Sequence, residues 1–232
     1  MSRGAHLHFS KTKDLPRPNH YVQALLGEYS AWAYDEDRAL ELRGQWRSRA
    51  FSVADDSPLD LEIGTGNGYH FAHYAKVHPE RCLLGIELKY KPLIQSIRRA
   101  VSAGCTNAHM VRYNAALLPQ LFQEGELDRV IIHFPDPWEK LRQQKHRLIQ
   151  PAFMEQLYRL QKPQAFVEFK TDSRDYFDWA LGVFEASPYS LEAQTFDLHQ
   201  SPYAEQNFVT HFERIFLRKG QPIHYALLRK PC

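Results

Sequence analysis

The 232-residue sequence has few cysteines, no long apolar run and little net charge, and each scarcity excludes a class of protein. Its three cysteines, Cys82, Cys105 and Cys232, form no CxxC pair, which argues against a disulfide framework and a structural zinc site. The longest apolar stretches, such as residues 130–132, are far shorter than the roughly 20 residues of a membrane helix. With 29 Lys and Arg against 27 Asp and Glu, the net charge of +2 does not by itself indicate a nucleic-acid partner.

The remaining composition is that of a globular protein. Hydrophobic residues make up 44% and charged residues 24%, which excludes a disordered chain, a collagen-like fibre and a coiled coil. The basic start of the chain, residues 1–14, lacks the apolar block of a secretory signal, so we expect a cytoplasmic protein. We also expect no membrane contact, no bound metal, and a monomer or weak homodimer.

The pattern of the chain changes near residue 52. We interpret residues 1–52 as a basic tail and an accessory segment, and residues 53–232 as one α/β domain. In that domain strand and helix patterns alternate, which predicts a mostly parallel, doubly wound sheet with helices on both faces. We expect strands over residues 58–63, 82–88, 109–112, 127–134 and 164–170, and helices over 67–77, 92–103, 150–160 and 173–184. Two later strands, over 190–196 and 223–228, have no clear helix between them and are expected to pair antiparallel at the sheet edge.

A glycine-rich segment follows the first of these strands. Residues Glu62 to Gly68 read EIGTGNG, and the glycines Gly64, Gly66 and Gly68 allow a tight turn and close approach of a ligand to the backbone. Glu87 ends the second strand 23 residues after Gly64, where an acid can accept both hydroxyls of a ribose. The combination predicts a nucleotide-like cofactor, and an ordinary glycine-rich turn is the alternative interpretation.

Two cofactor classes compete for this loop. Dinucleotides are usually bound by GxGxxG, in which the start of the helix meets the pyrophosphate, whereas the spacing here is GxGxG. Glu62 beside the loop would repel a pyrophosphate but attract the ammonium or sulfonium group of S-adenosylmethionine. The methyl donor is therefore favoured, and an NAD-dependent oxidoreductase is the competing hypothesis.

The sequence FPDPW, residues 134–138, ends the fourth strand, at the edge where open α/β sheets bind their ligands. Two prolines restrict the backbone around Asp136 and hold its carboxylate in place, while Trp138 offers a flat apolar face. We predict that Asp136 is the central residue of the site, and the alternative is a proline-rich turn with an exposed acid.

Basic residues follow FPDPW directly. The run from Glu139 to residue 147 has a local net charge of +3 and contains Lys140, Arg142, Lys145 and Arg147. A second basic stretch follows Glu213 and contains Arg214, Arg218, Lys219, Arg229 and Lys230. Because phosphate contacts supply affinity without reading a base sequence, these segments indicate a polyanionic substrate, unless they are solvated faces.

Taken together, these segments resemble the bacterial tRNA (guanine-N7)-methyltransferases. The matching elements are EIGTGNG at 62–68, GIE at 85–87, FPDPW at 134–138, TD at 171–172 and THFERIFLRKGQPI at 210–223. The resemblance implies a Rossmann-like class I methyltransferase fold, S-adenosylmethionine as cofactor, tRNA as partner and 7-methylguanosine in the variable loop as product. A diverged paralogue acting on another RNA guanine and a non-catalytic tRNA-binding protein are the alternatives.

The resemblance also implies roles for individual residues. Cofactor contacts would come from Glu62, the loop glycines, Glu87, Asn114, Ala115 and Asp136, and substrate contacts from Lys140, Asp172, Thr210, Phe212 and Glu213. Guanine N7 carries a lone pair and no proton, so its methylation needs no general base. Catalysis would come from positioning and from Asp136, which would stabilise the positive charge arriving on the purine. The N–H donors of guanine call for a carboxylate, and the candidates are Asp172, otherwise a helix cap, and Glu213, otherwise a strand-edge charge.

Overall fold

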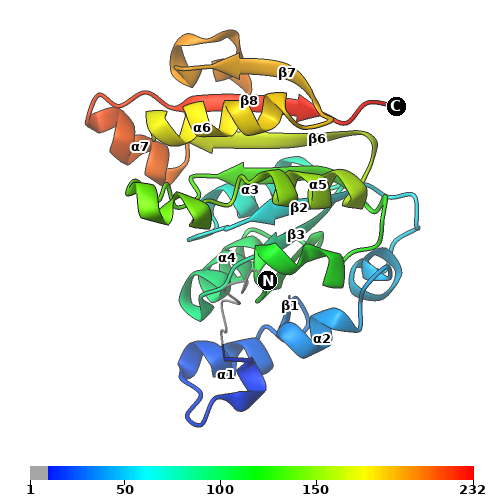
Figure 1. The fold of residues 1–232 in the computed structure, drawn as a ribbon. Coiled ribbons are helices and arrows are strands. Elements are labelled where there is room, and N and C mark those ends of the chain that lie inside the picture. The colour runs from blue at the N-terminus through cyan, green and yellow to red at the C-terminus, as the bar shows by residue number, and fades with distance from the viewer. Residues whose placement is uncertain (1–9) are drawn as a thin grey trace.

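A computed structural model describes residues 10–232, so the first nine residues of the predicted basic tail lie outside the described part. Within it, eight strands form one sheet in the order β1-β4-β3-β2-β5-β6-β8-β7 (Figure 1). Their bounds are β1 (Ala33–Tyr34), β2 (Leu59–Ile63), β3 (Cys82–Ile86), β4 (Ala108–Val111), β5 (Leu127–His133), β6 (Gln161–Thr171), β7 (Ser190–Thr195) and β8 (His224–Arg229). Neighbours from β1 to β6 are parallel, and β8 is antiparallel to β6 and β7. The expected mostly parallel sheet with an antiparallel pair at its edge is confirmed.

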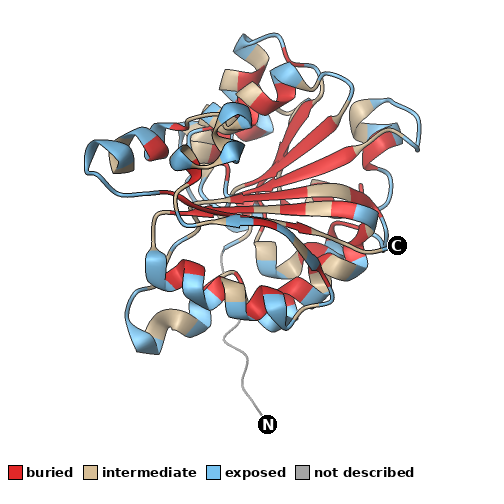
Figure 2. Ribbon diagram, turned by 90° about the horizontal axis from the view of Figure 1, so that it is seen from above, coloured by how far each residue is buried: buried red, intermediate tan, exposed pale blue. Residues whose placement is uncertain are grey.

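Helices cover both faces of this sheet (Figure 2). They are α1 (His20–Leu26), α2 (Glu36–Leu40), α3 (Tyr69–Val77), α4 (Tyr90–Ser102), α5 (Pro151–Leu160), α6 (Arg174–Glu185) and α7 (His211–Arg218), with short helical turns η1 (Thr12–Asp14), η2 (Trp46–Phe51), η3 (Ala115–Gln120), η4 (Leu141–His146), η5 (Leu198–Gln200) and η6 (Pro202–Gln206). Successive strand residues face opposite layers: Leu83 belongs to the apolar cluster that includes residues of α1, α3 and α4, and Leu84 to the cluster that includes residues of α5 and α6. Burial on both faces explains why these strands read as nearly continuous apolar runs.

One expectation about the secondary structure is wrong. Helix α7 lies between β7 and β8, where the sequence pattern indicated no helix. Thr210 caps its start, since the Thr210 hydroxyl accepts a hydrogen bond from the amide of Glu213 at 3.2 Å. Phe212, Ile215 and Phe216 stand at helical spacing on its apolar side.

The accessory segment contacts the sheet directly. Its strand β1 pairs with β4 through Ala33 and Tyr34, and the side chain of Trp46 is fully buried. The indole Nε1 of Trp46 donates a hydrogen bond to the carbonyl of Leu121 at 2.8 Å. Residues 33–51 therefore contribute to the same core as the sheet, while the division of the chain at residue 52 stays a prediction.

The described part of the chain, residues 10–232, contains all three cysteines. No helix in this part is long and apolar enough to cross a membrane, and no group of three or more His, Cys, Asp or Glu side chains there could hold a metal ion. Cys82 and Cys105 are buried and Cys232 is exposed, and all three are free thiols. Burial raises the pKa of Cys82 to about 11, so this thiol stays protonated at neutral pH.

The strand order indicates where a ligand would bind: at the carboxyl ends of the parallel strands, which we call the ligand edge. From β2 the chain passes to β3 and β4 on one side, and then returns to β5 and β6 on the other. Open parallel sheets bind ligands outside the carboxyl ends of their strands at this reversal. Because β2 to β6 run in one direction, the loops after Ile63, Ile86, Val111, His133 and Thr171 all leave the sheet at that edge.

Candidate functional site

The glycine loop connects β2 to α3 at the ligand edge. Gly64, Gly66 and Gly68 have φ values of +75°, +54° and +74°, in the left-handed region where a side chain is strained. A Cβ at Gly68 would also lie 2.3 Å from the Cα of Ser96 in α4, whereas a Cβ at Gly64 would meet no atom within 4 Å. The loop therefore packs tightly on α4 at one end and presents bare backbone to open space at the other.

Glu87 lies against this loop, directly after β3. Its Oε2 accepts a hydrogen bond from the amide of Gly66 at 3.3 Å, and its Oε1 accepts one from the amide of Lys89 at 3.0 Å. Burial raises the pKa of Glu87, although the hydrogen bonds from these backbone amides oppose that shift. The carboxylate is thus held beside the loop, where it can accept further hydrogen bonds from a ligand's hydroxyl groups.

Glu62 lies at the base of the loop, within β2, and is almost completely buried. Its Oε2 is 2.8 Å from Nδ1 of His70 in α3. The ring of His70 in turn meets the ring of His133 in β5, with 4.5 Å between the two centroids. The negative charge of Glu62 is therefore placed under the loop, in contact with protein groups and not with bulk solvent.

Asn114 and Ala115 follow β4 at the same edge. The Oδ1 atom of Asn114 accepts a hydrogen bond from the amide of Ala116 at 3.0 Å and so caps η3. Both Asn114 and Ala115 are half-buried, and Ala115 packs against the apolar core. The structure therefore brings this pair to the same edge as the glycine loop and Glu87.

Asp136 is exposed and lies in the loop that follows β5. The residues on either side of the PDP segment, Phe134 and Trp138, have φ values of +52° and +45°, which are unusual for residues other than glycine. Such conformations cost about 1–3 kcal/mol each and tend to occur at functional sites. The amide of Phe134 donates to the carbonyl of Lys170 at 2.8 Å, which ties this strained loop to β6.

The four predicted phosphate-binding residues do not all face solvent. Lys140, Arg142 and Lys145 are exposed on and beside η4. Arg147 is 2% exposed: it donates from Nε to the carbonyl of Pro137 at 2.8 Å and forms an ion pair with Asp175 in α6. The first three form an exposed basic surface next to Asp136, whereas the contacts of Arg147 stabilise the loop that carries Asp136.

Asp172 directly follows β6 and is half-buried. Burial raises the pKa of its carboxyl group, with smaller effects from neighbouring charges. Ser173 caps α6, since its Oγ accepts from the amide of Tyr176 at 3.3 Å. The alternative interpretation of Asp172 as the helix cap is therefore wrong.

Helix α7 brings the segment Thr210 to Glu213 next to the glycine loop. Phe212 is exposed, its ring centroid lies 6.5 Å from that of Phe134, and a Cβ at Gly66 would lie 3.8 Å from the ring. Glu213 is fully buried, so the alternative interpretation of Glu213 as a strand-edge surface charge is wrong. Sequence reasoning did not identify the partners of this carboxylate: Asn207 stands six residues before it in a loop, and Lys170 comes from β6.

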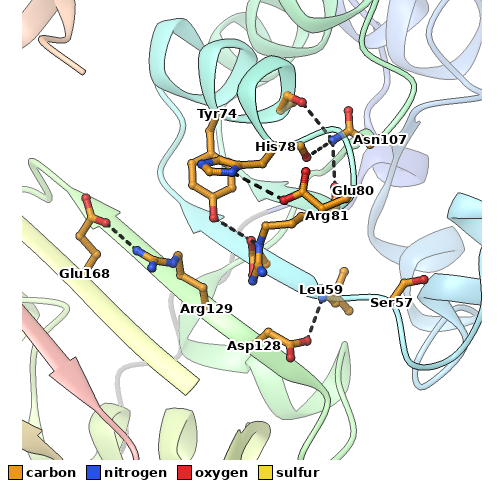
Figure 3. A network of polar contacts seen from close by, with 12 residues as sticks. Ser57, Leu59, Tyr74, His78, Glu80, Arg81, Asn107, Asp128, Arg129 and Glu168 are labelled. Carbon is orange, nitrogen blue, oxygen red and sulfur yellow. Dashed lines mark hydrogen bonds and ion pairs between the residues drawn. The ribbon is translucent and has the colours of Figure 1, made fainter. Parts of the chain in front are cut away.

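A cavity of about 960 Å³ lies elsewhere, on the α3 side of β5, β6 and β8. The residues that line it in the described chain include none of the predicted cofactor or substrate residues. Its charged groups pair with protein groups: Arg129 contacts Glu168 at 3.0 Å (Figure 3), and Arg81 contacts Asp60 at 2.5 Å. These charged groups are already paired within the protein, so the cavity is not our candidate for the functional site.

Known proteins resemble this chain in sequence and in fold. A family model described as "Putative methyltransferase" matches residues 56–226. A tRNA (guanine-N(7)-)-methyltransferase of Bdellovibrio bacteriovorus is 53% identical over 207 residues, covering 89% of this chain and 99% of that protein. Its counterpart in Listeria monocytogenes is 35% identical over 184 residues, covering 79% and 84%. The crystal structure of the 16S rRNA methyltransferase KamB gives a TM-score of 0.57 at 13% identity, covering 81% of this chain and 92% of that one, which concerns the fold alone.

The packing of Gly68 against α4 leads to a stability prediction. Gly125→Ala should cost about 1–2 kcal/mol, because its φ of +67° is left-handed but the space around it is open. Gly68→Ala adds a clash with the backbone of Ser96 and should cost about 1–3 kcal/mol more. Urea denaturation of the two variants measures the difference, and equal losses would show that the loop does not press on α4.

Proposed function

The chain belongs to the tRNA (guanine-N7)-methyltransferase family, and from this premise we propose that it transfers a methyl group from S-adenosylmethionine to N7 of a guanine in tRNA. One observation carries the proposal. The glycine loop, Glu87, Asn114 and Asp136 come from four different loops and meet at one edge of the sheet. That edge is where a parallel α/β sheet binds a nucleoside.

The residues at this edge suit the cofactor. Gly64 and Gly66 leave room for a ligand at the backbone, and Glu87 offers carboxylate oxygens beside them for the two hydroxyls of a ribose. Glu62 contributes negative charge from beneath the loop, which favours a cationic ligand over a pyrophosphate. When bound, S-adenosylmethionine supplies an electrophilic methyl group on a positively charged sulfur.

The chemistry at guanine requires little of the protein. N7 has a free lone pair and carries no proton, so no side chain has to remove one. The main task of the site is to hold N7 at attack distance, and this positioning can lower the barrier by several kcal/mol. The carboxylate of Asp136 is held between two strained residues, and we assign to it the stabilisation of the positive charge that arrives on the purine.

Selection of guanine over adenine requires an acceptor for the N1–H and N2–H₂ donors. Asp172 is half-buried at the ligand edge, and we propose that it reads these donors. Glu213 is fully buried and lies within 3.6 Å of the ammonium of Lys170, so we assign it to fixing α7 beside the base. Phe212 and Thr210 complete the segment next to the guanine.

The exposed cations Lys140, Arg142 and Lys145 supply the contacts to tRNA phosphates in this proposal. They lie a few residues after Asp136, so the phosphate backbone would pass beside the reacting base. The variable loop as the methylated region, the cytoplasm as the location and a monomeric or weakly dimeric state are part of the same proposal.

The direct test is methylation of tRNA by the purified protein with S-adenosylmethionine, followed by mapping of 7-methylguanine. Asp136→Asn should bind the cofactor but lower kcat at saturating tRNA roughly ten- to a hundredfold, the effect of losing a charged contact in the transition state. Wild-type protein that binds tRNA without methylating it would indicate the non-catalytic alternative. A product at another base would indicate the diverged paralogue.

Glu87→Ala should weaken binding of S-adenosylhomocysteine, the product left after the cofactor has given up its methyl group, by about 1–3 kcal/mol. The reason is that hydrogen bonds from the ribose to a carboxylate are lost. Isothermal titration calorimetry measures this change without tRNA. Glu80→Ala is the matched control, since Glu80 precedes β3 at the opposite edge and is 65% exposed in its side chain. Equal affinities of wild type and Glu87→Ala would reject the ribose assignment.

The tRNA affinity should fall steeply with salt concentration. Lys140→Gln, Arg142→Gln and Lys145→Gln should each reduce the slope of log K against log salt by about one unit or less. Lys162→Gln should leave the slope unchanged, because Lys162 pairs with Asp128 at 3.1 Å near the amino end of β6. Filter binding over a salt series measures the slopes, and an affinity independent of salt would contradict a phosphate-binding surface.

A further inference from the structure

Lys170 has a buried ammonium at the carboxyl end of β6, and the function proposed above gives it no contact with guanine or cofactor. Lys170 is only 3% exposed, and lysines are rarely buried to this extent unless an opposite charge compensates them. Its Nζ lies 2.5 Å from Oδ1 of Asn207, 3.7 Å from Oε1 of Glu168 and 3.6 Å from Oε1 of Glu213. Lys170 thus stands between a carboxylate of its own strand and a carboxylate of α7.

The Glu168 side of this arrangement is anionic. Burial alone would raise the pKa of Glu168, but the hydrogen bond from His133 and the charge of Lys170 outweigh burial and hold that pKa well below its ordinary value. Burial lowers the pKa of His133 to about 3, so its imidazole is neutral. Its Nε2 lies 2.9 Å from Oε1 of Glu168 and must be the donor, since a carboxylate only accepts. His133 therefore brings no charge to balance Glu213.

The Glu213 side depends on Lys170 for its charge balance. A fully buried carboxylate is strongly unfavourable unless a cation and hydrogen bonds compensate it. Asn207 donates from Nδ2 to Oε2 of Glu213 at 3.0 Å but is neutral, and Nε2 of His199 lies 3.6 Å from the same oxygen. Lys170 is the one lysine or arginine in the described chain that lies within ion-pair distance of Glu213.

Glu213 lies in the first turn of α7, so the contacts of its side chain help to fix the position of that turn. Thr210 caps the helix through the amide of Glu213, and His211 and Phe212 lie between them. The ring of His211 stacks near Tyr69 of α3 at 5.8 Å between centroids, and Phe212 lies over Gly66. A shift of Glu213 would therefore move both rings away from the glycine loop. Figure 1 shows α7 at the end of the sheet where β6 finishes.

We propose that Lys170 is a positioning residue for the guanine-binding segment Thr210–Glu213, acting through the buried carboxylate of Glu213 to fix the first turn of α7 beside the cofactor loop. The inference rests on the proposed function, because it gives α7 the task of holding the base. Lys170 itself contacts neither guanine nor cofactor in this proposal. Its removal should therefore impair tRNA use and leave cofactor binding intact.

The test compares Lys170→Met, Glu213→Gln and the double variant with wild type. The measured quantities are kcat and KM for tRNA, the Kd of S-adenosylhomocysteine, and hydrogen exchange of the α7 amides. Lys162→Met is the matched control, since Lys162 lies on the same strand and forms its ion pair with Asp128 away from α7. If Lys170 only stabilised the fold, its replacement would lower the fraction of protein that binds S-adenosylhomocysteine and would speed up amide hydrogen exchange throughout the sheet.

Lys170→Met should raise KM for tRNA about tenfold or more, change kcat less than about threefold, and leave the Kd of S-adenosylhomocysteine within about twofold. Exchange in α7 should accelerate while that in β2 and β5 does not. Because Lys170 acts through Glu213, adding Lys170→Met to Glu213→Gln should change KM less than about twofold. The double variant carries no uncompensated Glu213 charge, so this comparison holds even if Lys170→Met alone does not fold.

The proposal is overturned if Lys170→Met leaves KM and α7 exchange unchanged, if cofactor affinity falls as much as tRNA use, or if the two substitutions multiply in their effects on KM. Failure of the proposed function gives a different result. Wild type would then methylate no tRNA guanine, while the exchange measurement would still report whether Lys170 holds α7.

Discussion

The shared direction of strands β2 to β6 is the constraint on which the rest of the molecule depends. Parallel strands end at one edge, so each short loop after a strand delivers its side chains to the same place. Glu87, Asp136 and Asp172 meet there although long stretches of chain separate them. The apolar layers on both faces keep this frame rigid, because each strand is buried on two sides by residues such as Leu83 and Leu84. The polar groups of the site can therefore be supplied by loops without weakening the core.

Features that depend on local pattern could be predicted from the sequence. The strands show as apolar runs, the glycine loop as a turn after a strand, and Asp136 as an acid between two prolines. Helix α7 was missed although the sequence carries its signals: Thr210-x-x-Glu213 is a capping pattern, and Phe212, Ile215 and Phe216 stand at helical spacing. Arg147 and Glu213 could not be placed from the sequence, since their burial depends on Asp175 and Lys170, which other segments supply. A charged residue in a basic run looks the same in sequence whether its side chain faces solvent or the core.

The protein keeps a line of buried polar groups beneath its ligand edge. It runs from Glu62 to His70 and His133, and from there through Glu168 and Lys170 to the segment around α7. In a low dielectric, contacts among such groups restrict where each side chain can lie, and losing one partner is costly. The side chains beneath the glycine loop and those that contact α7 thus belong to one connected set of contacts. In the function proposed here, these contacts would help to align the methyl donor with the guanine of tRNA.

The position of β8 has a consequence for the order in which the chain can fold during synthesis. β8 leaves the ribosome after β7 and α7, yet it lies between β6 and β7 in the sheet. Within the described residues β7 pairs with β8 alone, so β7 has no strand to join until β8 has been made. At about 5–20 residues per second, translation from β7 to β8 takes a few seconds. During that interval the nascent chain already contains β2 to β6 and the loops that follow them, whereas α7 is made only between β7 and β8. The loops at the carboxyl ends of the parallel strands can therefore form before α7 is held in place.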